Sequence, residues 1–224
     1  MEEYLSEKEQ WEWVKEQVRS SGPWIIVAVV LVFAGVGGWR WWQQRQDAAR
    51  LEAGGRYLQI LQALEHGDRT LALTVLGQLE RDNPGSPYTD QARLLAARVY
   101  VDEGELDKAA GELTTVSAQS KDRELAMIAR ERLARVQIAQ GKPDAALQTL
   151  GVADPGAFAA RYHEARGDAY YAKGDQSAAL GEYRSARAPG SNAPLLDLKI
   201  ADLAAAAPVS AQSSSAVAAP MAVK

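Results

Sequence analysis

The 224-residue sequence contains no cysteine, only two histidines and no long block of basic residues. The lack of cysteine excludes disulfides and thiolate metal sites. The two histidines, His66 and His163, lie far apart without the paired spacing of metal ligands, so we expect no metal site. The formal net charge is −4, and a nucleic-acid partner is therefore not indicated.

The sequence also lacks the common motifs of catalysis. It contains no G-x-S-x-G nucleophile elbow, no phosphate-cradling loop and no dinucleotide fingerprint. Acidic residues such as Asp102, Asp107 and Glu112 are interpreted as solvated charges on polar helix faces. We therefore expect no catalytic residue, no cofactor and no enzymatic activity.

One long hydrophobic run is present, over residues 23–42, and it predicts a transmembrane helix. Arg40 is the only charged residue between Trp24 and Trp42, and a helix of this length spans about 30 Å, one hydrocarbon core. Tryptophans at both borders are typical of a membrane-spanning helix. A buried core helix or a cleaved signal peptide is the alternative. However, the preceding segment, residues 1–22, carries six Glu against three basic residues, and no Ala-x-Ala-like site follows the run.

The pattern after residue 42 is helical, with almost no alternation of period two, which predicts an all-α chain. Four stretches align, beginning at Glu65, Asp102, Ala139 and Ala172. Each contains a glycine, followed five residues later by alanine and nine residues later by leucine or tyrosine. The glycines are Gly67, Gly104, Gly141 and Gly174; the alanines Ala72, Ala109, Ala146 and Ala179; the large residues Leu76, Leu113, Leu150 and Tyr183.

This spacing predicts a helical hairpin around each glycine. Glycine can adopt the left-handed conformation that ends one helix, and Asp68 or Asp175 can then cap the next helix. Pro143 fits the first turn of the second helix in the third unit. The alanine allows the two helices to pack closely, while the larger residue fills the core. A small residue also recurs seven positions before three of the glycines, at Ala97, Ala134 and Gly167, and the first unit has Ile60 there.

Helical repeats of 33 to 37 residues resemble tetratricopeptide repeats. They depart from that pattern at the bulky aromatic that usually opens the first helix, where this sequence has Arg56, Arg93, Arg130 and His163. Stacked hairpins bury a continuous core, so we predict one α-solenoid over residues 43–206, closed by a capping helix at 193–206. The Ser/Ala/Pro-rich residues 207–224 are predicted to form a disordered tail.

Such a solenoid offers a concave groove lined by the first helix of each pair. Transferring those turns to this sequence gives nine candidate partner-binding residues: Leu94, Arg98, Val101, Glu131, Arg135, Ile138, Glu164, Asp168 and Tyr171. Arg98 and Arg135 are one repeat apart, so we expect them to stack on one wall and hold a carboxylate or a peptide carbonyl. Alternatively, these arginines pair with acidic neighbours such as Glu131.

The sequence resembles the YfgM family in four features. These are the acidic N-terminal segment, the hydrophobic run ending in GWRWWQQ, the divergent repeats and the segment RLARVQIAQGKPDAALQTL at 132–150. Members of this family are ancillary subunits of the SecYEG translocon in Gram-negative bacteria. Three Lys or Arg precede the predicted membrane helix, whereas Arg40 lies at its C-terminal end and Arg45, Arg50 and Arg56 follow, so charge alone does not fix the orientation. The resemblance implies a single-pass inner-membrane protein with a cytoplasmic N-terminus and periplasmic repeats. It also implies SecYEG and a PpiD-type chaperone as partners.

We therefore expect a non-catalytic adaptor or chaperone subunit that contacts inner-membrane lipid, the translocon and client polypeptides emerging into the periplasm. Tethering would give it a high effective concentration beside the channel, so weak contacts could suffice. Two alternatives are a scaffold subunit of another envelope assembly complex and a receptor whose repeats face the cytosol.

Overall fold

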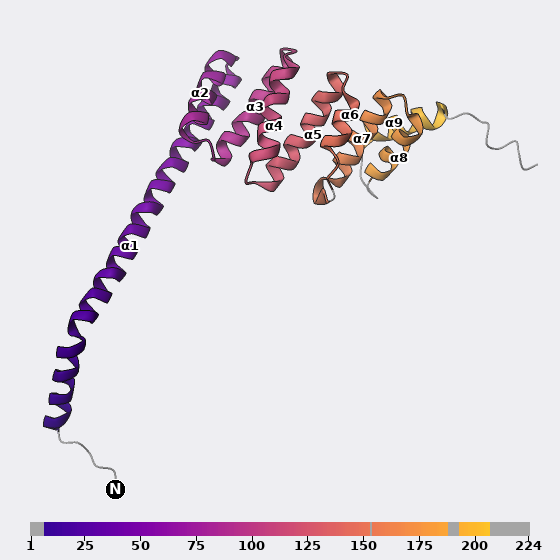
Figure 1. Cartoon of the computed structure of the whole chain (residues 1–224). Helices are drawn as coiled ribbons and strands as arrows, with labels where there is room; N and C mark the ends of the chain where they lie inside the picture. The colour runs from indigo at the N-terminus through magenta and orange to yellow at the C-terminus, as the bar shows by residue number, and fades with distance from the viewer. Residues whose placement is uncertain (1–6, 153, 188–192, 207–224) are drawn as a thin grey trace, which may run out of the picture. The chain divides into compact units, whose positions relative to one another are not determined.

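The structure is a computed structural model that describes residues 7–152, 154–187 and 193–206. The predicted disordered tail, 207–224, and residues 1–6 lie outside the described residues, as do the side chains of 7–10, 13, 14, 16–23, 25 and 26. The described residues form nine α-helices and one 3-10 turn, with no strand (Figure 1). The prediction of an all-α chain is confirmed.

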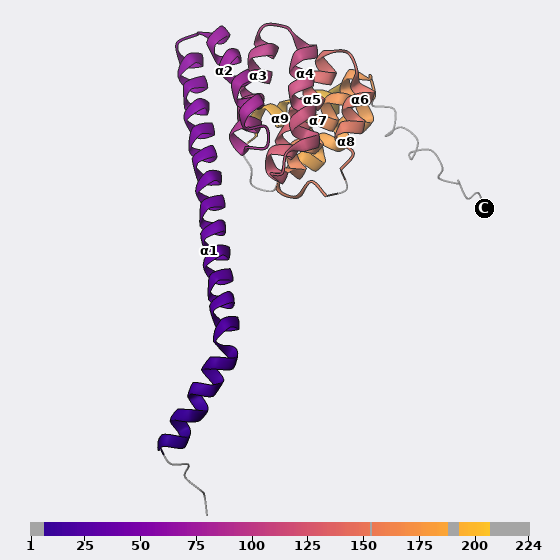
Figure 2. The ribbon, with the colours of Figure 1, turned by 60° about the vertical axis from the view of Figure 1, so that its left-hand side comes forward.

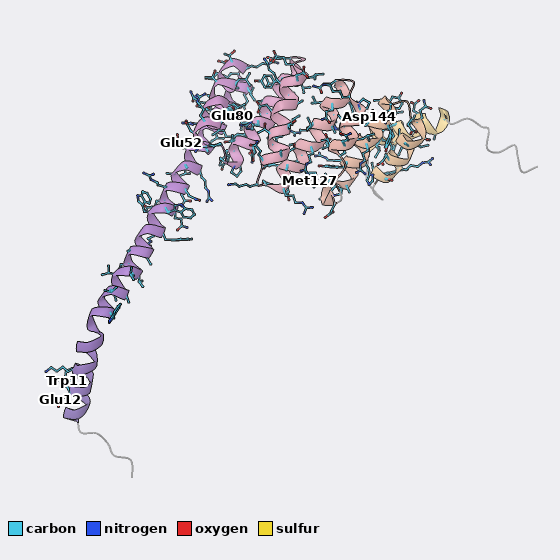
Figure 3. All side chains as sticks on the ribbon, viewed as in Figure 1. Trp11, Glu12, Glu52, Glu80, Met127 and Asp144 are labelled. Carbon is cyan, nitrogen blue, oxygen red and sulfur yellow. The ribbon has the colours of Figure 1, made fainter. Side chains whose placement is uncertain are left out.

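The first of the chain's two compact units, Met1–Glu52, is described by part of the long helix α1 (Glu7–Glu65). This helix runs without interruption through both borders of the predicted membrane span. All described side chains of this unit are exposed, and Trp11 and Glu12 project from the helix near its start (Figure 3). Near residue 42, the Trp39 and Trp42 rings lie 5.7 Å apart and the guanidinium of Arg45 lies 4.6 Å from the ring centre of Trp41.

Among the residues that the structure describes, no helix combines the length and the apolar character needed to cross a membrane. The span predicted over 23–42 is therefore not found there. Ile25 and Ile26 belong to that span, and their side chains lie outside the described residues.

The second unit, Ala53–Lys224, contains the end of α1 and a succession of shorter helices. These are α2 (Arg69–Asp82), α3 (Pro87–Asp102), α4 (Leu106–Gln119), α5 (Arg123–Ala139), α6 (Pro143–Thr149), a 3-10 turn (Gly156–Phe158), α7 (Ala159–Ala172), α8 (Gln176–Ala186) and α9 (Pro194–Ala206). Successive helices pack on one another from α2 to α9, and α5 also packs on α7 (Figures 1 and 2). Helical hairpins therefore follow one another through this unit, and α9 packs against α8. That one solenoid extends over residues 43–206 remains a prediction.

The turns within the hairpins have the predicted geometry. Gly67, Gly104, Gly141 and Gly174 have φ angles between 73° and 80°, a conformation that other residues adopt only with strain. Asp68 accepts a hydrogen bond from the backbone N–H of Leu71, and Asp175 accepts one from that of Ala178. Pro143 is the first residue of α6. The local signals in the sequence therefore place these helix boundaries correctly.

The core positions also repeat as predicted. The four alanines five residues after the turn glycines are at most 3% exposed, and the larger residues four positions further on are at most 4% exposed. The fourth unit differs, because it combines Tyr183 with Gly167. A Cβ atom placed on Gly167 would lie 2.4 Å from two carbon atoms of the Tyr183 ring, which is far inside contact distance. The larger ring therefore requires the missing Cβ at Gly167.

The positions that lack the expected aromatic instead form polar links between helices. Arg93 of α3 bonds to Glu80 of α2 at 3.1 Å and to Glu112 of α4 at 3.2 Å. His163 Nδ1 lies 2.7 Å from Glu182 Oε2, and Arg130 donates to the Ser117 carbonyl. Arg56 bonds to a carboxylate of α2. These contacts connect neighbouring helices at the position where an aromatic ring would otherwise pack.

Candidate partner-binding groove

A surface pocket of about 300 Å³ lies between α3, α4 and α5. Helix α3 contributes Leu94, Ala97, Arg98 and Val101; α4 contributes Leu106 and Leu113; and α5 contributes Arg132, Arg135, Val136 and Ala139. We call this the groove pocket. The first helices of two successive hairpins, α3 and α5, supply most of its lining, as expected of a concave tetratricopeptide-like surface. Apart from its three arginines, its lining is entirely apolar.

The three arginines at the groove pocket differ in their bonding. Arg135 Nε bonds to Glu131 Oε1 at 2.5 Å, and Glu131 is only 7% exposed. The alternative proposed from the sequence, that an arginine pairs with Glu131, is thus confirmed for Arg135. Within the described part of the chain, neither Arg98 nor Arg132 takes part in a hydrogen bond or an ion pair. Two exposed guanidinium groups therefore border the apolar pocket without an internal acidic partner among the described residues.

The groove continues from this pocket towards the first hairpin. A neighbouring pocket of about 340 Å³ is lined by Leu61, Leu64, Glu65, Arg69, Leu95, Arg98, Val99 and Asp102. Arg98 lines both pockets, so its side chain stands at their junction. Arg69 at this end bonds to Glu103 at 3.2 Å, which leaves Arg98 as the better placed of the two arginines to meet a ligand.

At the fourth unit, the capping helix α9 contacts the surface of α7. Lys199 Nζ bonds to Glu164 Oε1 at 3.0 Å and to Asp168 Oδ1 at 2.7 Å, and the Tyr183 hydroxyl donates to the same Asp168 oxygen at 2.8 Å. Burial by itself would lower the pKa of Lys199, but the hydrogen bonds to the two carboxylates raise it above its ordinary value. Burial also raises the pKa of Tyr183, and its bond to Asp168 adds to that effect.

Comparison with known proteins identifies the family. A model of the tetratricopeptide repeat-like domain matches residues 15–205. The chain belongs to this family. It is 32% identical over 179 residues to the ancillary SecYEG translocon subunit of Escherichia coli (strain K12), an alignment that covers 80% of this chain and 86% of the relative.

Two further relatives have the same name. The protein from Haemophilus influenzae is 29% identical over 187 residues, covering 84% of this chain and 91% of the relative. The protein from Neisseria gonorrhoeae is 28% identical over 187 residues, covering 83% and 90%. The resemblance to the YfgM family, inferred from the sequence, is confirmed by these matches.

The structure brings together four of the nine candidate residues, Leu94, Arg98, Val101 and Arg135, at the groove pocket. Asp168 and Tyr171 line a separate pocket of about 250 Å³ beside α9. The remaining three are occupied elsewhere: Glu131 pairs with Arg135, Ile138 packs against the core of the third unit, and Glu164 bonds to Lys199. That any of the nine contacts a partner remains a prediction.

The sequence-based selection missed Arg132 and the two leucines of α4, Leu106 and Leu113. Arg132 lies three residues before Arg135, about one helical turn, and this spacing could have indicated it. The leucines lie on the second helix of a hairpin, whereas the candidate residues were all taken from first helices. In the described ranges, no group of three or more His, Asp or Glu side chains is placed to hold a metal ion.

Proposed function

We propose that this protein is a membrane-anchored, non-catalytic adaptor that works beside the SecYEG translocon. The observation that carries the proposal is the groove pocket, an open apolar surface between successive hairpins with two available guanidinium groups. Such a surface suits binding of another polypeptide and supplies no nucleophile or general base. The choice of the translocon rests on the names of the relatives, whose alignments cover 80% to 84% of this chain.

The proposed anchor is residues 23–42, with the N-terminus in the cytoplasm and the repeats in the periplasm. It is supported by the sequence and by exposed apolar side chains on α1: Val27, Val29, Val30, Leu31, Val32, Phe33 and Val36 are each 47% to 74% exposed. Exposing apolar surface to water costs about 25 cal/mol per Å², and lipid removes this cost. Trp24 and the group Trp39, Trp41 and Trp42 would then lie at the two membrane interfaces.

In this proposal the chain acts by proximity. An anchored array beside the channel meets its ligands at an effective concentration that reaches the millimolar range for short tethers. Reversible contacts with a PpiD-type chaperone and with polypeptides that emerge into the periplasm would therefore suffice. The groove is the surface that would make these contacts.

Copurification tests the partnership. The tagged full chain is purified from inner membranes in mild detergent, and SecY and a PpiD-type chaperone are quantified in the eluate. We expect both to coelute. Phe33→Arg, which places a charge within the proposed anchor, should release the chain from the membrane fraction. Stoichiometric recovery with a different envelope complex, without SecY, would refute the proposal in favour of a scaffold there.

Protease digestion of spheroplasts tests the orientation. Repeats in the periplasm should be digested by protease added from outside, whereas a cytoplasmic control protein stays intact. Repeats that survive in intact spheroplasts, and are digested only after lysis, would place the array in the cytosol.

A further inference from the structure

We propose that the groove pocket selects an acidic, apolar peptide segment, in which one leucine-sized or phenylalanine-sized side chain enters the pocket and flanking carboxylates bind Arg98 and Arg132. This inference rests on the proposed function in that it names the ligand class of the same groove. The ligand would contact residues of α3, α4 and α5.

The apolar part of the ligand follows from the lining of the pocket. Leu94, Leu113 and Val136 are 2% to 6% exposed and form its inner wall, while Val101 is 41% exposed and lies nearer the solvent. Its volume of about 300 Å³ is at the lower end of the range of ligand pockets, roughly 300–1,000 Å³. It therefore accepts one large side chain more readily than the whole face of a helix. Burial of such a side chain accounts for about a tenfold or larger gain in affinity.

The acidic part of the ligand follows from the charges at the rim. The chain has 29 acidic and 25 basic residues, yet the described side chains include no acidic partner for Arg98 or Arg132. Guanidinium groups bind carboxylates through two parallel hydrogen bonds, which gives direction as well as affinity. Arg135 contributes less because Glu131 already holds it. A basic segment in the groove pocket would meet arginines and no carboxylate in the lining, because Glu65 and Asp102 line the neighbouring pocket.

The acidic residues of α7 do not offer a competing site for a basic ligand. The acidic side chains there, Glu164 and Asp168, are both bonded to Lys199 of α9. Both are residues that the sequence analysis predicted to bind a partner, and Lys199 already pairs with them. The arginines that line the groove pocket and are unpaired among the described residues thus lie on α3 and α5.

Fluorescence anisotropy with the full chain in detergent micelles tests this inference. The probes are three short labelled peptides: one with a central leucine flanked by aspartates, a second with lysine in place of aspartate, and a third with serine in place of leucine. We expect the acidic leucine peptide to bind about tenfold more tightly than either of the others, and its binding to weaken with added salt.

Three variants assign the effect to the pocket. The double variant Arg98→Gln/Arg132→Gln should weaken binding of the acidic leucine peptide about tenfold, because each exposed ion pair contributes a few-fold. Arg161→Gln is the matched control, since Arg161 is also exposed and helical but lies on α7 outside the pocket, and it should have no effect. Ala139→Phe, at an exposed position of the lining, should obstruct the pocket and abolish the preference for leucine over serine. Circular dichroism confirms that each variant is folded.

Equal binding of the acidic and basic peptides, or equal effects of the double variant and Arg161→Gln, would overturn the inference. SecY copurification measured on the same variants separates the two proposals. SecY retained without any peptide preference would overturn this inference and leave the proposed function standing. A clear peptide preference without SecY would support the inference and refute the translocon partnership.

Discussion

Gly167→Ala should destabilise the solenoid although it replaces glycine within a helix. An added Cβ would lie 2.4 Å from two ring carbons of Tyr183 and 3.1 Å from a third. The ring is 3% exposed and its hydroxyl is bonded to Asp168, so it cannot turn away without losing that bond. Asp168 is held in turn by Lys199. The clash must therefore be relieved by separating α7 and α8 or by displacing the ring.

The magnitude follows from three contributions. Overpacking a core costs about 1–3 kcal/mol, and loss of the tyrosine hydrogen bond costs about 1 kcal/mol more. Alanine gains about 1 kcal/mol over glycine in helix propensity. The net destabilisation is thus about 2 kcal/mol, which lowers the Tm of a domain of this size by about 4–8 °C. Thermal unfolding followed by circular dichroism measures this change.

A double-mutant cycle isolates the cause. Tyr183→Leu restores the combination of leucine with alanine that the second and third units use at Leu113 and Ala97 or Leu150 and Ala134. In that background Gly167→Ala should be neutral or stabilising by up to about 1 kcal/mol, a coupling energy of about 2–3 kcal/mol. Gly111→Ala, on an exposed face of α4 with open space around it, is the control and should stabilise. Equal destabilisation by Gly167→Ala with and without Tyr183 would refute the reasoning.

Three further predictions concern the turns, the buried charges and the capping helix. Gly141→Ala should cost about 1–2 kcal/mol in urea unfolding, because its φ of 73° is strained for alanine although space is open around it. Burial, followed by the charge of Glu80, raises the pKa of Glu112 above 4.5, so the folded state keeps this proton to higher pH and the residue's contribution to stability falls as pH rises from the unfolded to the folded pKa. Glu112→Gln should therefore become more stable relative to the parent as pH rises from below to above 4.5. A stability difference that does not change with pH would contradict this sign. Lys199→Gln should increase hydrogen exchange of α9 amides about fivefold while leaving α4 unchanged, because α9 loses its bonds to Glu164 and Asp168. Unchanged exchange in α9 would show that apolar contacts alone hold this helix.

The features that sequence analysis predicted well are local and periodic. A turn glycine, the caps at Asp68 and Asp175, and the alanine five residues after each glycine act within a few residues of one another, so their spacing determines the hairpin. The predicted C-terminal border of the membrane span, at residue 42, does not coincide with a helix end, because the glycines and tryptophans near it do not stop the helix. As a result α1 continues from Glu7 to Glu65.

The candidate site was predicted only in part because it depends on contacts between repeats. The position of Arg98 on a first helix indicated that it faces the groove. The spacing of four residues also offered Glu131 as a partner for Arg135, but the sequence did not decide which of the two arginines is paired. The bonds from Lys199 to Glu164 and Asp168 join positions more than 30 residues apart in sequence. Such pairs follow no period, so only the folded structure reveals them.

The capping helix α9 also affects how the array can grow. Leu196 and Leu203 are 6% and 4% exposed and pack against Ala179, Tyr183 and Ala186, the surface on which a fifth hairpin would otherwise stack. A gene duplication that lengthened this protein would thus have to be inserted ahead of Pro194, since repeats appended after α9 would find their docking surface already covered.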